Sequence, residues 1–212
     1  MSHQDKRICN GLSNFIGRFR KQFAPITAAL LAGSLMLPSA NVAAEPSMEA
    51  LQKVLKGQIG LMKPELQEKV QGLSQDTKMS LMAILAMHNR YSNEATMRQV
   101  MLEVFADYQS MAMGIMTDST EMTADSARRL ANHRIPVGGL LPYLGMENIT
   151  DDRLAVLDGF NSSVEGNAIK LAAAADAGDM ATAASLLGEI SSGCVACHTV
   201  FRSKPGQSDL LR

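Results

Sequence analysis

Apolar residues recur at spacings of three and four along most of the chain, and this periodicity predicts helices. Alternation of apolar and polar positions, which is typical of half-buried strands, is scarce. The chain is rich in Ala, Leu and Met and has no Trp. The pattern therefore predicts an all-α fold.

Four long segments each carry one apolar stripe. We expect helices over 94–116, 120–133, 150–177 and 180–202, with a loop rich in Pro and Gly over 134–146. Amphipathic helices of this length, mostly joined by short connections, are typical of an antiparallel four-helix bundle. The inward residues would be Met97, Met101, Val104, Tyr108, Met111 and Ile115; Ala127, Leu130 and Ala131; Leu154, Leu157, Phe160, Val164, Ala168, Leu171 and Ala175; and Ala183, Leu187, Ile190, Cys194, Cys197 and Phe201.

Capping residues mark the third and fourth of these helices. Thr150 is a good N-cap, and the acidic pair 151–152 suits the first turn of the third helix. Gly178 ends that helix, and Asp179 caps the next. Before the bundle, residues 45–93 form an extension with short helices expected near 48–61, 64–72 and 78–89.

The N-terminal segment has the order of a secretory leader. Basic residues precede an apolar run over 23–37, and small residues at 42–44 offer a cleavage site. We expect a signal peptide over 1–44, the extension over 45–93, the bundle domain over 94–205 and a tail over 206–212. The expected location is the periplasm, and an uncleaved membrane anchor is the alternative.

The cysteines supply the candidate chemistry. Cys9 leaves with the leader, so an exported chain retains only Cys194 and Cys197, with His198 directly after them. Two thiols one helical turn apart can each bond a haem vinyl group, and the adjacent histidine then binds the iron. A zinc site with His88 and His133 and a redox dithiol are the alternatives. The spacing predicts one covalently bound haem c.

The second iron ligand would come from a neighbouring helix. The candidates are Met97, Met101, His88 and His133, with Met111 or Tyr108 further along. An antiparallel first helix brings Met101 near His198, with Met97 one turn away as the alternative, although most methionines in such a chain fill the core. His133 is expected to cap the second helix at the surface, and His88 has no predicted face. Arg202 would either reach a haem propionate or end its helix in solvent.

Gly193 would let the flat macrocycle approach the helix backbone.

The net charge helps to exclude some functions. Once the basic leader is removed the chain is acidic, which argues against nucleic-acid binding. The sequence has no evident catalytic acid–base pair, nucleophile–base set or phosphate-binding loop, so we expect no enzyme activity and no substrate.

The segment 168–179 and the run from Cys194 to Arg202 resemble the class II c-type cytochromes, the cytochrome c′ superfamily. The resemblance covers about 97–204 and implies a four-helix bundle with haem on its last helix. It implies that Met101 is the sixth ligand of a low-spin member; a one-residue shift to Leu102 would match the five-coordinate branch. It also implies a homodimer through the first two bundle helices.

Three functions are open, the first two on this resemblance and the third on the extension, which departs from the family pattern. The first is an electron carrier with His/Met-ligated iron that meets periplasmic redox proteins. The alternative is a five-coordinate protein that binds nitric oxide or carbon monoxide at an open distal face. The third is an accessory haem subunit that docks through residues 45–93.

Overall fold

The computed structural model describes residues 48–201 and 208–211, and most of them lie in helices. The all-α prediction is confirmed. Within these ranges no strand forms, and the only β-type pairings are isolated bridges, Met62 with Leu211 and Tyr91 with Ile135. The leader expected over 1–44, the residue Arg202 and part of the tail lie outside the described residues.

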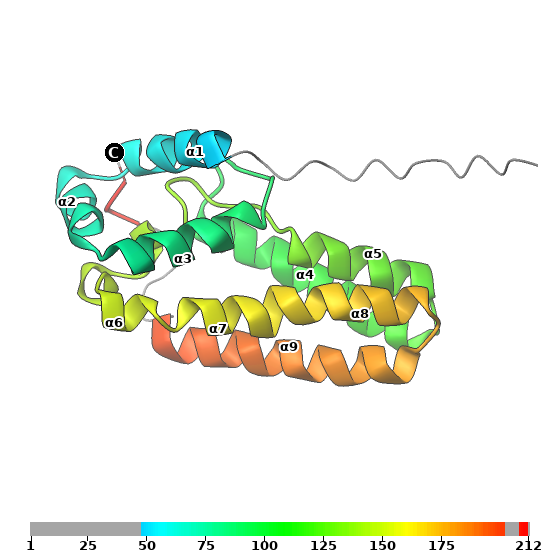
Figure 1. The fold of residues 1–212 in the computed structure, drawn as a ribbon. Coiled ribbons are helices and arrows are strands. Elements are labelled where there is room, and N and C mark those ends of the chain that lie inside the picture. Colours follow the sequence, from blue (N-terminus) through cyan, green and yellow to red (C-terminus); the bar gives the residue numbers. More distant parts are fainter. Residues whose placement is uncertain (1–47, 202–207, 212) are drawn as a thin grey trace, which may run out of the picture. The chain divides into compact units, whose positions relative to one another are not determined.

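Four helices lie side by side: α4 (Met97–Met116), α5 (Thr120–Ala131), α8 (Asn167–Asp176) and α9 (Met180–Phe201) (Figure 1). Helix α4 contacts α5, α5 contacts α8, α8 contacts α9, and α9 also contacts α4. Thr96 and Gln99 form a reciprocal capping box at the start of α4. As expected, Gly178 ends α8 with a φ of +76°, and the Asp179 carboxylate accepts from the Thr182 amide.

The third helix is not continuous, which corrects the expectation. It divides into α6 (Asp151–Leu154), α7 (Leu157–Asn161), the π-helical turn η3 (Ser162–Gly166) and α8. Thr150 does cap its start, accepting from the Arg153 amide at 3.3 Å. Inside it, the Ser163 hydroxyl donates to the Phe160 carbonyl at 3.0 Å, a side-chain bond that competes with regular helical bonding. The π turn sits at this point.

The extension forms α1 (Met48–Gly60), α2 (Pro64–Gly72) and α3 (Gln75–Ala86). Helix α3 begins earlier than predicted because the Ser74 hydroxyl caps it, accepting from the Thr77 amide. Between α5 and α6 the chain forms two 3₁₀ turns, Leu141–Tyr143 and Met146–Asn148. The extension shares one core with this segment and with α6, α7 and α9, here called the extension cluster: Met62, Leu66, Val70, Leu73, Leu141, Leu144, Ile149, Leu154, Leu157 and Phe201.

A second core lies among α4, α5, α8 and α9. Most of the predicted inward positions are buried or half-buried there, and Ala127 and Leu130 are fully enclosed. We call this set the bundle cluster: Met111, Ala127, Leu130, Ala131, Ala168, Leu171, Ala172, Ala183 and Ile190.

Candidate functional site

The two cysteines of α9 lie between the two cores. Cys194 is half-buried against the bundle cluster, and Cys197 is half-buried against the extension cluster. Both are free thiols. The predicted position in an apolar seam is therefore correct for both residues, and each sulfur has apolar neighbours.

Burial controls the ionisation of these thiols. It raises the pKa of Cys197 to about 11, with the nearby Glu165 carboxylate adding to the effect. Burial, followed by Glu165, also raises the pKa of Cys194. Reactive dithiols instead have lowered pKa values that favour the thiolate at neutral pH. The arrangement therefore argues against the redox-dithiol alternative.

Gly193 lies where η3 approaches α9. A Cβ atom there would lie 2.6 Å from the Ser163 hydroxyl oxygen and 2.8 Å from a Val164 methyl carbon. Its missing side chain lets η3 approach α9 closely. The π turn therefore occupies the space beside this glycine, and the expectation that Gly193 makes room for a macrocycle stays a prediction.

Helix α9 is apolar in composition. Among the described residues, Met180–Phe201 is the one helix that is long and apolar enough to cross a membrane, by length and composition alone. Only 17% of its most apolar 18-residue stretch is buried. Core helices of soluble proteins can have the same length and composition. Val195, inside the motif, is 66% exposed, and His198 is exposed as well. Much of the apolar surface around the motif is thus exposed in the described part of the chain.

The methionines expected as iron ligands lie on α4. Met97 and Met101 are both half-buried, whereas Leu102 is 62% exposed. The hydroxyl groups of Tyr108 on α4 and Ser191 on α9 are 2.6 Å apart, and the two helices run antiparallel (Figure 1). Met101 and His198 each lie seven residues from this contact, about 10 Å along their helices toward the same end.

His88 and His133 are in different environments from those expected. His133 is not a surface cap: its side chain is 16% exposed, and its Nε2 lies 3.1 Å from a Glu165 carboxylate oxygen. His88 is 3% exposed, and its ring centroid lies 4.6 Å from that of His133. The two rings and Glu165 therefore form one cluster, here called the His–Glu cluster. Sequence periodicity gave no signal for Glu165, since Val164 occupies the predicted inward position.

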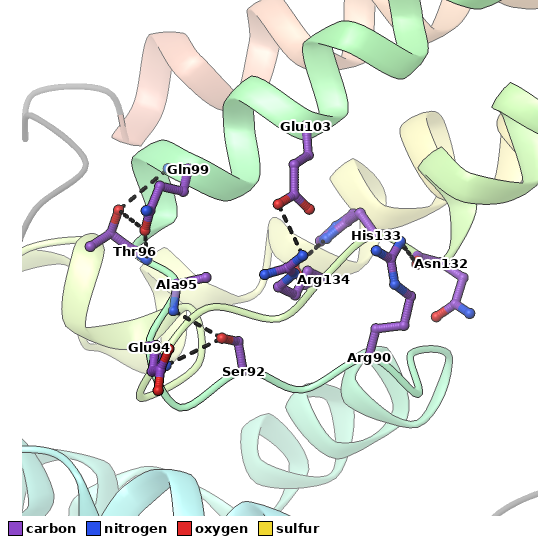
Figure 2. A network of polar contacts seen from close by, with 10 residues as sticks. All are labelled: Arg90, Ser92, Glu94, Ala95, Thr96, Gln99, Glu103, Asn132, His133 and Arg134. Atoms are coloured by element: carbon purple, nitrogen blue, oxygen red, sulfur yellow. Dashed lines mark hydrogen bonds and ion pairs between the residues drawn. The ribbon is translucent and has the colours of Figure 1, made fainter.

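Pairing between two loops holds the histidines together. The amide of Ile135 donates to the Arg90 carbonyl at 2.8 Å, and the amide of Ser92 donates to the Ile135 carbonyl at 3.0 Å. The side-chain amides of Asn89 and Asn132 are also hydrogen-bonded at 2.8 Å. Figure 2 shows the neighbouring polar contacts, in which Arg134 pairs with Glu103.

Both histidines have shifted proton affinities. Burial lowers the pKa of His88, and the adjacent His133 lowers it further. For His133, burial has the largest single influence and favours the neutral ring. The hydrogen bonds to Glu165 and to the Arg134 carbonyl outweigh it, so the pKa of His133 is raised.

These observations bear on which group the motif can hold. Zinc bound jointly by the thiols and the two histidines has no support, because among the described residues the histidines group with Glu165 and not with sulfur. Two apolar-seated thiols and an adjacent histidine match the donors that covalent haem requires. The residues at the motif therefore fit haem in donor type.

The chain was compared with known proteins in three ways. No family model matches it, and neither a curated protein nor a solved structure matches it.

Proposed function

We propose that the chain is an exported mono-haem c-type cytochrome of the class II type that carries one electron at a time in the periplasm. The observation that carries this proposal is the Cys194–Cys197–His198 motif on an apolar, partly uncovered helix. The antiparallel contact of α4 with α9 supports the further proposal that α4, α5, α8 and α9 form the four-helix bundle expected for this class.

The residues have distinct proposed roles. Cys194 and Cys197 would hold haem c through two thioethers, and His198 would bind its iron. Met101 would be the sixth ligand, supported by its half-buried side chain and its position along α4. A haem iron held by histidine and methionine has a raised potential and suits one-electron exchange.

An electron carrier also needs a surface near the haem that a redox partner can contact, and the exposed apolar residues of α9 suit this role. Val195 lies inside the motif and is 66% exposed, so a redox protein can approach the attachment site without a change of fold. The acidic character of the chain after the leader suits a partner with a basic contact surface. Redox proteins of the periplasm are the proposed partners.

The first test is covalent attachment. The chain is produced together with a bacterial haem-attachment system, and haem is detected after boiling in detergent and electrophoresis. We expect haem on the wild-type chain and none on the variant with both Cys194→Ala and Cys197→Ala. Cys9→Ala is the matched control and should keep its haem. Absence of haem from the wild-type chain, or haem that survives loss of both thiols, would contradict the proposal.

The second test separates carrier from gas binder. Optical spectra are recorded on oxidised and reduced protein, with and without carbon monoxide. A low-spin spectrum that carbon monoxide does not change supports six-coordinate iron and electron transfer. A high-spin spectrum that shifts with the gas would replace the proposal with gas binding at an open distal face.

A further inference from the structure

We infer that His88, His133 and Glu165 form a binding site for a divalent transition metal of the zinc class, separate from the cysteine motif. One ring nitrogen from each histidine and one carboxylate oxygen lie within 4.8 Å of one another. Two imidazoles and a carboxylate form a donor set that zinc binds in proteins, with a fourth position left open.

The hydrogen bonds of the rings orient the correct nitrogen toward the cluster. The Nδ1 atom of His88 is 3.1 Å from the Ile84 carbonyl oxygen, and Nδ1 of His133 is 2.9 Å from the Arg134 carbonyl oxygen. Because a carbonyl only accepts, each Nδ1 carries the hydrogen. The lone pair of each neutral ring is then on Nε2, the arrangement that metal-binding histidines use.

The Nε2 atoms of His88 and His133 both lack a suitable partner when the rings are neutral and no cation is bound. The Nε2 atom of His88 is buried and has no hydrogen-bond partner among the described residues. With Nδ1 donating to a carbonyl, a neutral His133 would present an Nε2 lone pair to a carboxylate oxygen 3.1 Å away. A proton on His133 resolves only the second contact. A metal ion resolves both, because it accepts electron pairs from both nitrogens and from Glu165.

The surrounding structure is built to hold these groups. The two histidines follow α3 and α5, and the loop pairing around Tyr91 and Ile135 fixes them side by side. Glu165 lies in the π turn, a deviation from α-helix that is frequent at functional sites.

Metal binding requires the donor atoms to move slightly closer together, and the positive charge of Arg90 opposes it. Bonds of about 2.0–2.2 Å to a tetrahedral zinc place donor atoms roughly 3.5 Å apart, so the most distant donors must close by about 1 Å. The positive charge of Arg90 lies near enough to lower the proton affinity of His133 and also opposes a cation. The Glu165 carboxylate offsets it.

The experiment measures Zn²⁺ binding to the full chain, both with haem attached and without it, after a chelator has removed bound metals. Stoichiometry is measured by elemental analysis after desalting, and affinity by competition with a chromophoric chelator. We expect one Zn²⁺ per chain in the wild type. Glu165→Gln keeps the size of the side chain and should weaken binding roughly tenfold or more, and His133→Ala should do the same.

Controls place the metal. Glu103→Gln makes the same change at a carboxylate that pairs with Arg134, next to His133, and should leave Zn²⁺ affinity unchanged. The double variant Cys194→Ser with Cys197→Ser should also keep its Zn²⁺. Circular dichroism checks that each variant is folded. Three results would overturn the inference: no Zn²⁺ on the wild type, loss of Zn²⁺ only with the thiols, or undiminished binding in the folded Glu165→Gln variant.

Discussion

The hydroxyl of Tyr108 on α4 lies 2.6 Å from that of Ser191 on α9, and this contact fixes the register of the two antiparallel helices. Counting the same number of residues from it in both helices brings Met101 level with His198. Met97 lies one turn beyond that level. Leu102, at 62% exposed, faces away from the core. The register therefore favours Met101 as the sixth ligand in the proposed haem site.

Replacing Met101 with Ala is expected to convert a low-spin iron to high spin and to open one face to carbon monoxide, because the sixth ligand is lost. Met97→Ala is the matched control, one turn away on the same helix, and should leave the spectrum unchanged. Absorption spectra with and without carbon monoxide measure both. A spectral change in Met97→Ala alone would move the ligand by one turn.

The extension is predicted to be part of the folding unit. Leu66 of α2 is fully buried in a cluster that includes Leu154 and Phe201. Leu66→Ala should lower the free energy of unfolding by about 2–5 kcal/mol, the usual effect of a cavity in a core. Leu102→Ala, the same change at a largely exposed site, should alter it by less than about 0.5 kcal/mol. Urea unfolding of the two variants measures the difference, and equal effects would mean that the extension does not stabilise the domain.

Asp151 makes the packing of the extension against α6 depend on pH. Its carboxylate accepts from the Thr77 hydroxyl at 2.6 Å and from the Ser74 amide at 3.0 Å, and these bonds lower its pKa below the ordinary 3.8. A carboxyl group whose pKa is lower in the folded state than in the unfolded chain stabilises the fold at pH values above the unfolded pKa. That contribution is lost as pH falls through the folded pKa.

Asp151→Asn should therefore be less stable than wild type at neutral pH. The difference should shrink as the pH falls below about 5 and disappear below the folded pKa. Urea midpoints over this pH range test the expectation. Asp152→Asn is the matched comparison, because it removes a neighbouring carboxylate and leaves the bonds of Asp151 to Ser74 and Thr77 in place. A wild-type advantage that persists at the lowest pH would assign the effect to something other than ionised Asp151.

Local patterns predicted the helices well and the His–Glu cluster not at all. The stop at Gly178 and the cap at Asp179 depend on nearby residues only, so the sequence contains their full signal. His88 and His133 meet because two loops pair through backbone bonds, which no periodicity reports. Glu165 reaches them from a π turn that interrupts a stripe predicted to be continuous.

Gly193 offers a test of how α9 packs on that π turn. A Cβ at this position would meet Ser163 and Val164 at less than 3 Å, and one of these neighbours is the rigid side chain of a valine. Gly193→Ala should destabilise the fold by about 1–3 kcal/mol, as overpacking does. Gly188→Ala on the same helix has open space around its Cβ and should be neutral or stabilising by up to about 1 kcal/mol. Thermal and urea unfolding measure both variants, in the haem-loaded chain and in the variant with both cysteines replaced. If Gly193→Ala impaired only haem attachment and left the haem-free chain as stable as before, the residue would face the cofactor and not η3.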